Sequence, residues 1–301
     1  MEVTIARKGF QALAGATEQQ SSEFMIRHEK LDLHIYLSSM NDLFLHEETI
    51  PDRVTELKRE FLSDEVVKDP VIVDAHSCVV LDGMHRVAAL RELDCTCLPV
   101  CAVDYLSPSI KVGAWYRSIS GTLSPEQVKV VLSASNIRFQ GFSFDISSIM
   151  ENPVLAMLFA NRECLKLKSN DLEVFETLKV AEQCLGQLGL TVKFETESDA
   201  LQNLVNEKTG AIMTIPRIDK ASVRRAGLTG RLLPHKVTRH VIPARPLGVN
   251  VPLKTLTGRK TPLTESNQRF VSNLQTRGIT RRPSGTIIEG RRYEEETFIF
   301  N

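Results

Sequence analysis

Residues 79–90 read VVLDGMHRVAAL, and this stretch decides the fold. It runs from a β-branched apolar segment through Asp82 and Gly83 into residues that favour a helix. The pattern predicts a strand, a tight turn at Gly83 and a helix from Met84. A helix that begins directly after a strand presents unpaired N–H groups and the positive end of its dipole. The corner therefore suits a bound anion such as phosphate.

Three side chains give this corner its possible chemistry. Arg86, in the first helical turn, is suited to a charge-assisted contact with phosphate, and His85 offers a further donor. Asp82 is placed to hold Mg²⁺ or to orient those donors. In the alternative interpretation Asp82 is an ordinary helix N-cap, and His85 and Arg86 are solvated. The spacing alone does not choose between the two interpretations.

The surrounding sequence predicts a compact mixed α/β domain over residues 29–118. A helix is expected within 49–62, with Thr49 or Asp52 as its cap and Pro51 in its first turn. Its apolar face should contain Val54, Leu57, Phe61 and Leu62. A second helix is expected over 84–93, and strands are expected at 31–39, 69–75, 77–83 and 97–106.

A second α/β domain is predicted over residues 119–256, after a stretch rich in Ser, Pro and Gly. Strands are expected at 191–195 and 211–216, with a short helix between them. The stretch 172–190 predicts a longer helix, whose apolar face carries Leu172, Phe175, Leu178, Ala181, Leu185 and Leu188. Residues 1–28 are expected to form a loose extension and 257–301 a tail, whose last residues form an edge strand.

Composition describes an ordinary soluble globular chain. The 301 residues carry zero formal net charge and 42% hydrophobic residues. No apolar run approaches the roughly 18–20 residues of a membrane span, and the N-terminus lacks the pattern of a signal peptide, so we expect a cytoplasmic protein. Cys95, Cys97 and Cys101 lack a second ligand pair, which predicts buried thiols and no zinc site.

Positive charge is concentrated in residues 216–246. This segment holds eight Lys or Arg residues against the single acid Asp219. It predicts a local anion site in a chain that is neutral as a whole. The tail is also basic up to about Arg292.

Residues 69–105 resemble the ParB/sulfiredoxin-like superfamily, whose hallmark is a strand, a Gly-x-His-Arg corner and an Ala-rich helix. Sulfiredoxins carry a catalytic cysteine just before the His-Arg pair, where this chain has Met84. ParB partition proteins usually continue with a helix-turn-helix region, and no clear equivalent follows residue 118. The resemblance therefore argues against thiol chemistry and against a standard partition protein.

The free-serine kinase branch of that superfamily is the closest match in pattern. LFLHEETIPDRVTELK (residues 43–58) resembles the branch's Leu-His-Glu segment, in which the acid after the histidine is the catalytic base; here that acid is Glu47, with Glu48 beside it. The branch's corner aspartate corresponds to Asp82 and its tryptophan to Trp115. The stretch PHKVTRH is similar to the branch's Pro-Lys-x-Thr-Arg-His pattern and carries over Lys236, Thr238, Arg239 and His240.

The resemblance implies a ParB/sulfiredoxin-like N-terminal domain, a second α/β domain and an active site in the cleft between them. It implies transfer of a phosphoryl group from ATP or ADP to free L-serine, with Mg²⁺. Glu47 and Asp82 are expected to be catalytic; the nucleotide is expected to contact Asp82, Gly83, Met84, His85, Arg86 and Lys236.

The expected substrate residues are Trp115, Thr238, Arg239 and His240, the last three being suited to the substrate carboxylate or to phosphate. Trp115 is equally consistent with an anchor at a domain interface. A ParB-like nucleotide-dependent DNA-binding or regulatory protein is the alternative function, supported by the shared corner and the basic segments. The sequence leaves the choice of ATP or ADP and the oligomeric state open.

Overall fold

The computed structural model describes residues 3–4, 23–120, 124–141, 146–169, 173–257 and 261–301. The chain forms two compact units, each discontinuous in sequence. Unit 1 contains residues 1–111, 220–232 and 240–301, and unit 2 contains residues 112–219 and 233–239. Two of the boundaries fall inside β8 (Lys111–Gly113) and β15 (Arg239–Val241). The units therefore divide the chain differently from the predicted continuous ranges.

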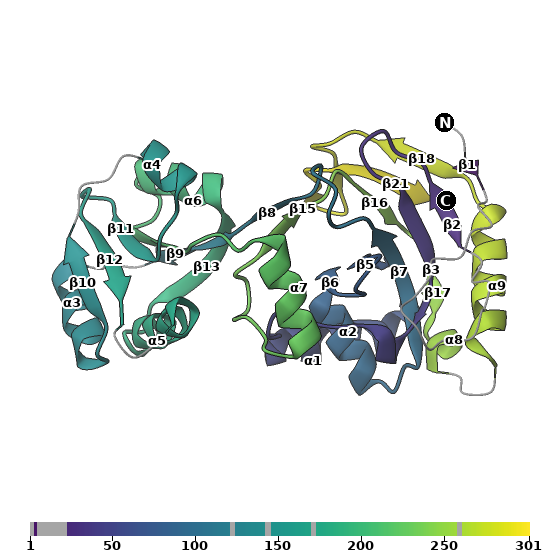
Figure 1. The fold of residues 1–301 in the computed structure, drawn as a ribbon, viewed down its shortest axis with the longest axis horizontal. Helices are drawn as coiled ribbons and strands as arrows, with labels where there is room; N and C mark the ends of the chain where they lie inside the picture. The colour runs from purple at the N-terminus through teal and green to yellow at the C-terminus, as the bar shows by residue number, and fades with distance from the viewer. Residues whose placement is uncertain (1–2, 5–22, 121–123, 142–145, 170–172, 258–260) are drawn as a thin grey trace. The chain divides into compact units, whose positions relative to one another are not determined.

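Unit 1 is built on a six-stranded mixed sheet (Figure 1). Its β5 and β7 pair in parallel and are buried at every position, which explains why both read as continuous apolar runs. The remaining neighbours pair antiparallel. In spatial order the strands are β1 (Val3–Thr4), β2 (Phe24–Ile26), β3 (Leu33–Ser39), β7 (Cys97–Val103), β5 (Val71–Asp74) and β6 (Val80–Asp82). The four strands expected in this region are confirmed.

The helices of unit 1 pack against this sheet and against each other. α1 (Pro51–Asp64) packs on α2 (Met84–Glu92), and α9 (Leu263–Gln275) packs on β3. α1 starts with Pro51 as predicted. Its N-cap is Ile50, without a side-chain cap bond, so the cap expected from Thr49 or Asp52 is wrong. The remaining described helices of unit 1 are η1 (Met40–Asp42), α7 (Lys220–Thr229) and α8 (Leu253–Thr257).

The C-terminal residues are part of unit 1. β21 (Glu296–Phe300) lies between β16 (Ala244–Leu247), to which it is parallel, and β18 (Ile279–Arg282). The expectation of an edge strand is therefore wrong, because two partners take both sides of β21. Two further strand pairs of unit 1 are β17 (Val251–Pro252) with β4 (Val66–Val67), and β19 (Ile287–Ile288) with β20 (Arg291–Arg292).

Unit 2 has a six-stranded sheet in which every neighbouring pair is antiparallel. The order is β10 (Arg138–Gly141), β12 (Cys164–Lys168), β11 (Ala156–Phe159), β14 (Ala211–Thr214), β9 (Trp115–Ser120) and β13 (Thr191–Thr196). α3 (Pro125–Ala134) and α5 (Val174–Gln187) pack together, and α6 (Glu197–Val205) covers β9, β13 and β14. α4 (Ile146–Glu151) completes the described helices of this unit. The fold is thus mixed α/β, with an antiparallel second sheet.

Several expectations about single residues can be compared with the structure. Cys95, Cys97 and Cys101 are buried free thiols, as predicted. Leu62 and Leu188 are exposed at 58% and 39% rather than packed in the core. Leu172 and residues 5–22 of the predicted extension lie outside the described ranges, whereas Phe24–Ile26 form β2. In the part of the chain that the structure describes, no helix has the length and apolar content needed to cross a membrane.

Candidate functional site

The corner between β6 and α2 has the geometry that the sequence predicted. Gly83 is the N-cap residue of α2 and has a φ of 97°, in the region that favours glycine. A Cβ atom added there would lie 2.7 Å from both Arg86 Nη2 and Val71 Cγ1. Met84 is the first residue of the helix. Glycine is therefore required for both the turn and the close approach of Arg86.

Asp82 pairs with two arginines and does not cap the helix. Its Oδ2 accepts hydrogen bonds from Arg86 Nη2 at 3.2 Å and from Arg245 Nη1 at 2.9 Å. These cations hold the pKa of Asp82 well below its usual range, against the opposing effect of burial. Arg245 also forms an ion pair with Glu295. The interpretation of Asp82 as an ordinary N-cap is therefore wrong.

His85 and Arg86 are both held by hydrogen bonds. Arg86 Nη1 donates to the carbonyl oxygens of Asp69 and Pro70 at 2.7 and 3.0 Å. The backbone N–H of Ile50 donates to His85 Nε2 at 3.0 Å, which assigns the ring proton of neutral His85 to Nδ1. Neither side chain is simply solvated. Because His85 Nε2 accepts a hydrogen bond, the donor expected from this residue would be Nδ1.

The segment that carries Glu47 is fixed to the same strand. Phe44 accepts a backbone hydrogen bond from Val80 at 2.8 Å, and His46 Nδ1 donates to the Val80 carbonyl at 2.7 Å. Burial lowers the pKa of His46 to about 4, so the ring is neutral near pH 7. Glu47 is 3% exposed, and its Oε1 lies 3.9 Å from His46 Nε2. The structure thus brings the predicted base and the predicted phosphate corner to neighbouring positions in unit 1.

His240 belongs to unit 1, whereas Thr238 and Arg239 belong to unit 2. Its Nε2 is hydrogen bonded to the Tyr105 hydroxyl at 2.9 Å, and its ring meets that of His46 edge-on with centroids 5.3 Å apart. Burial, followed by the effect of His46, lowers the pKa of His240 to about 3. His240 is therefore grouped with Glu47 and Asp82 and not with the other predicted substrate residues.

Unit 2 brings together three of the other predicted residues. The Lys236 ammonium lies 5.2 Å and the Arg239 guanidinium 5.7 Å from the centre of the Trp115 ring. Such cation–π contacts favour placing positive charge over an indole face. Thr238, between the two cations in sequence, is 5% exposed. Trp115 thus supports two cations within its own unit.

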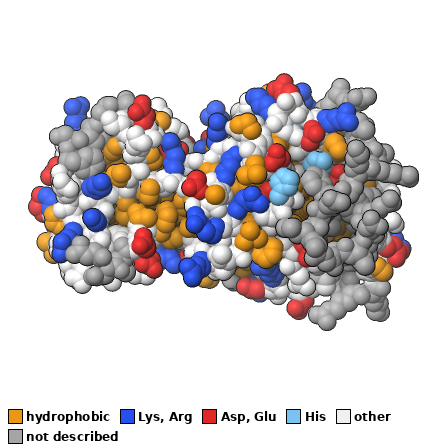
Figure 2. Space-filling view, in the orientation of Figure 1, with side chains coloured by type: hydrophobic (Ala, Val, Ile, Leu, Met, Phe, Trp, Pro, Cys, Tyr) orange, Lys and Arg blue, Asp and Glu red, His pale blue; other side chains and the backbone are white. Residues whose placement is uncertain are grey.

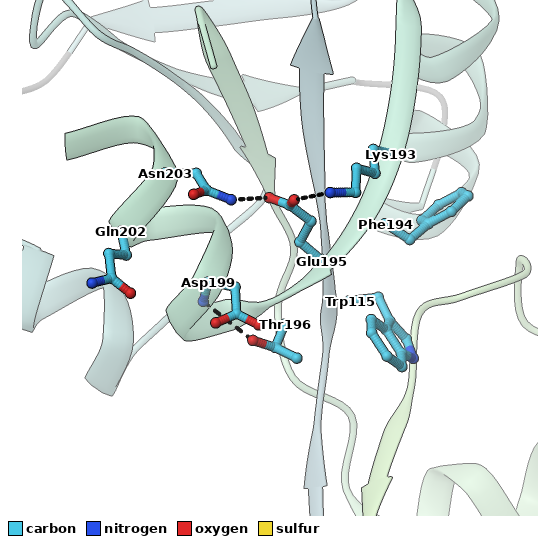
Figure 3. A pocket seen from close by; sticks show the side chains of 8 residues that line it. All are labelled: Trp115, Lys193, Phe194, Glu195, Thr196, Asp199, Gln202 and Asn203. Carbon is cyan, nitrogen blue, oxygen red and sulfur yellow. Dashed lines mark hydrogen bonds and ion pairs between the residues drawn. The ribbon is translucent and has the colours of Figure 1, made fainter. Parts of the chain in front are cut away.

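Trp115 also lines a pocket of about 330 Å³ in unit 2 (Figure 3). The pocket wall includes Phe194 and Glu195, and Glu195 accepts hydrogen bonds from Ser118 at 2.5 Å and from Asn203 at 3.0 Å. The remaining lining residues are Lys193, Thr196, Asp199, Gln202 and Asn203. Among the described lining residues, Trp115 is the one that the sequence singled out.

Four residues that contact the predicted site residues, or pair with a residue that does, were not indicated by the sequence: Arg117, Tyr105, Arg245 and Glu295. Arg117 donates a hydrogen bond to the Lys236 carbonyl. Tyr105 contacts His240, and Arg245 with Glu295 completes the ion network at Asp82. Arg245 lies inside the segment flagged as basic, but nothing in the sequence pairs it with Asp82. Other cations of that segment are also paired, Arg217 with Glu197 and Arg224 with Asp74.

The predicted Mg²⁺ ligand Asp82 does not form a metal site by itself. It is one carboxylate, already hydrogen bonded to two arginines, whereas Mg²⁺ prefers several oxygen ligands. Within the described ranges, a group of three possible ligands occurs elsewhere, at His28, Glu29 and Glu296. That group includes Glu296, which is also paired with Arg281.

Comparison with known proteins gives several relatives by sequence, although no protein-family model matches. An "ATP-dependent L-serine kinase" from Staphylothermus marinus is 26% identical over 231 residues, covering 73% of this chain and 90% of that protein. The "ADP-dependent L-serine kinase SerK" of Thermococcus kodakarensis is 23% identical over 184 residues, covering 59% and 73%. A "ParB-like protein" from Sulfolobus acidocaldarius is 26% identical over 203 residues, covering 65% and 84%.

Solved structures share the fold. A free serine kinase in complex with AMP superposes with a TM-score of 0.63 at 18% identity, covering 73% of this chain and 93% of that one. SbnI from Staphylococcus aureus, with a C-terminal truncation, has a TM-score of 0.62 at 19% identity and covers 82% and 97%. By sequence and by fold, this chain is a relative of the ParB-like L-serine kinases.

Proposed function

We propose that this protein is a free L-serine kinase, which transfers a phosphoryl group from ATP or ADP to the hydroxyl of L-serine and forms O-phospho-L-serine. One structural observation carries the proposal beyond the relatives' names. Two hydrogen bonds join the segment that carries Glu47 to the Gly83 corner: the Val80 N–H donates to the Phe44 carbonyl, and the Ile50 N–H donates to the His85 ring. A buried carboxylate therefore lies in the same unit as a helix N-terminus suited to phosphate.

Phosphoryl transfer requires an in-line hydroxyl, an acceptor for its proton and positive charge around the phosphoryl oxygens. In the proposed reaction the serine hydroxyl oxygen bonds to the terminal phosphorus, and the bond from that phosphorus to the nucleotide oxygen breaks. The hydroxyl proton passes to Glu47. Glu47 is suited to this role because it is a buried carboxylate beside the neutral ring of His46, which is held by a hydrogen bond to Val80 of β6.

The nucleotide phosphates are proposed to bind at the corner. The first turn of α2, which begins with Met84 and His85, would present its backbone N–H groups to a phosphate at the corner. Arg86 supplies charge there, and Asp82 orients Arg86 through the 3.2 Å contact. Lys236 is proposed as a further phosphate contact. The catalytic role predicted for Asp82 is thus mainly to orient these cations.

Trp115, Thr238, Arg239 and His240 are proposed as the residues that bind the amino-acid substrate. Trp115 provides an apolar wall, and Thr238 and Arg239 are suited to the serine carboxylate. His240 is neutral and offers a hydrogen-bonding ring beside Glu47's segment. The expected cleft between domains remains a prediction. Mg²⁺ also remains a prediction, in which nucleotide phosphate oxygens are its main ligands.

The alternative function is nucleotide-dependent DNA binding. Figure 2 shows basic and acidic side chains interspersed on the visible face, in keeping with the zero net charge of the chain. The decisive assay incubates purified protein with Mg²⁺, L-serine and ATP or ADP and examines the products for O-phosphoserine. Absence of product with either nucleotide, together with salt-sensitive binding to duplex DNA, would favour the alternative.

A further inference from the structure

Arg117 is a fully buried arginine of unit 2. It lies on β9 and is 0% exposed. Its Nε donates to Glu182 at 2.5 Å, and its Nη1 donates to the carbonyl oxygens of Trp115 at 2.7 Å and Lys236 at 2.9 Å. Its Nη2 donates to the His235 carbonyl at 3.1 Å. One guanidinium therefore joins β9, α5 and the turn at residues 235–236.

That turn has an unusual backbone conformation. Lys236 has a φ of 57°, in the left-handed region that lysine rarely adopts. Such a conformation is energetically unfavourable and persists only where the surrounding structure holds it. The two hydrogen bonds from Arg117 to His235 and Lys236 are such a constraint. They fix the point from which the Lys236 side chain reaches Trp115.

A lysine side chain cannot make the hydrogen bonds that Arg117 makes. A guanidinium presents five N–H groups in a rigid plane, whereas an ammonium is a single point charge on a flexible stem. In a buried site, the charge of Arg117 is balanced by Glu182, whose side chain is 15% exposed. A lysine at 117 keeps the ion pair within reach but leaves some of the three carbonyl groups without a donor.

We infer that Arg117 is a positioning residue, which sets the Lys236 turn and Trp115 in the arrangement that the reaction uses. We call Arg117 and its hydrogen bonds to Glu182, Trp115, His235 and Lys236 the clamp. The inference rests on the proposed function, because it requires the proposed roles of Lys236 and Trp115 in the reaction. Arg117 itself is buried and acts through these two residues. The clamp lies wholly within unit 2.

Trp115 is the single tryptophan of the chain, so its fluorescence reports on this site directly. We would compare quenching by iodide with quenching by neutral acrylamide at constant total salt. Cations over the indole raise the local iodide concentration. Lys236→Met should therefore lower the iodide-to-acrylamide quenching ratio, and Arg117→Lys should lower it in the same direction. Arg138→Lys, on the exposed edge strand β10, is the matched control and should leave the ratio unchanged.

The kinetic test uses the same variants in the full-length protein. Folded Arg117→Lys should lose about 10- to 100-fold in kcat, the scale expected for a misplaced reacting group. The KM for L-serine should rise as well, because the substitution also disturbs Trp115, the proposed wall of the serine site. Arg117→Lys with the wild-type quenching ratio and wild-type kcat, and a normal circular dichroism spectrum, would overturn the inference.

Two further comparisons cover the cases in which Arg117→Lys does not fold or the wild-type protein is inactive. If Arg117→Lys does not fold, Glu182→Gln takes its place, since it weakens the clamp while keeping the guanidinium. It should shift the quenching ratio in the same direction by a smaller amount, and an unchanged ratio would then overturn the inference. If the wild-type protein does not phosphorylate L-serine, the proposed function fails, and the quenching ratio still decides whether Arg117 sets the Lys236 turn.

Discussion

Arg245 donates a 2.9 Å hydrogen bond to the carboxylate of Asp82, across 163 residues of sequence. The contact joins Asp82, which ends β6, to β16. Arg245 also pairs with Glu295, so each carboxylate in the network has a cation beside it. The phosphate corner thus depends on residues that no local motif reveals.

Arg245→Met should lower the free energy of unfolding by about 2–3 kcal/mol at pH 7. This lies below the range for a fully buried pair because the Asp82 side chain is 36% exposed. The pKa of Asp82 is depressed in the folded state, so its pairing stabilises the protein above the unfolded pKa and is lost as the pH falls. The deficit measured by urea unfolding should therefore shrink below about pH 4.

Arg281→Met is the control for this prediction. Arg281 pairs with Glu296 near the surface, where its own side chain is 49% exposed, so its loss should lower the free energy of unfolding much less than the loss of Arg245. Equal decreases in the free energy of unfolding for Arg245→Met and Arg281→Met would show that the Asp82 network stabilises the fold no more than a surface ion pair does.

Gly83→Ala should destabilise the protein and weaken nucleotide binding. The substitution adds a Cβ at a φ of 97° and at 2.7 Å from Arg86 and Val71. Gly189→Ala is the matched control, since its φ is 70° and nothing lies within 4 Å of the added atom. In the control, the positive φ should lower the free energy of unfolding by about 1–2 kcal/mol. Gly83→Ala should lower it by about 1–3 kcal/mol more, because the added Cβ also meets Arg86 and Val71. Calorimetric titration should show weaker ADP binding by Gly83→Ala and wild-type ADP binding by Gly189→Ala. Wild-type ADP affinity in Gly83→Ala would show that the corner does not bind the nucleotide.

Glu47→Gln should keep the fold and nucleotide affinity but lower kcat about 10²- to 10⁴-fold, because the amide cannot accept the serine proton. Glu48→Gln should retain most turnover, since Glu48 is less buried than Glu47. Steady-state rates of O-phosphoserine formation make the comparison. Full activity in Glu47→Gln, or the larger loss in Glu48→Gln, would exclude Glu47 as the base.

The two buried histidines predict a pH dependence of stability. Burial lowers the pKa of His46 to about 4 and of His240 to about 3, below their unfolded value near 6.5. Between these values the unfolded chain binds more protons than the folded one, so stability falls as the pH drops from about 6.5 toward 4. The slope should approach about 1.4 kcal/mol per pH unit for each histidine.

Urea unfolding from pH 7 to pH 4.5 measures this slope. His240→Gln should flatten it, because one buried ring no longer takes up a proton on unfolding. His76→Gln removes a histidine whose side chain is 49% exposed and should leave the slope as in the wild type. An unchanged slope in His240→Gln would contradict the assignment of a buried neutral ring.

The elements with strong local patterns were predictable from sequence, and those set by distant partners were not. The apolar runs of β5 and β7 and the turn at Gly83 each follow from neighbouring residues. α7 was missed because its basic sequence buries just Val223, Ala226 and Gly227. β21 was expected at an edge because the pairing with β16 and β18 has no trace in its own residues.

The candidate site shows the same division. Asp82, Gly83 and Arg86 lie within five residues, so a short motif describes them. The contact of Arg245 with Asp82 and those of Arg117 with Glu182, His235 and Lys236 join residues more than 60 positions apart. Their partners are set by tertiary packing, which a single sequence does not report.

The central claim is tested most directly by the phosphorus NMR spectrum of the protein incubated with Mg²⁺, L-serine and either ATP or ADP. We expect a phosphomonoester signal of O-phospho-L-serine to grow in step with nucleotide consumption, and to be nearly absent with Glu47→Gln. Nucleotide consumption without phosphoserine, or no reaction with either nucleotide, would contradict the proposed function.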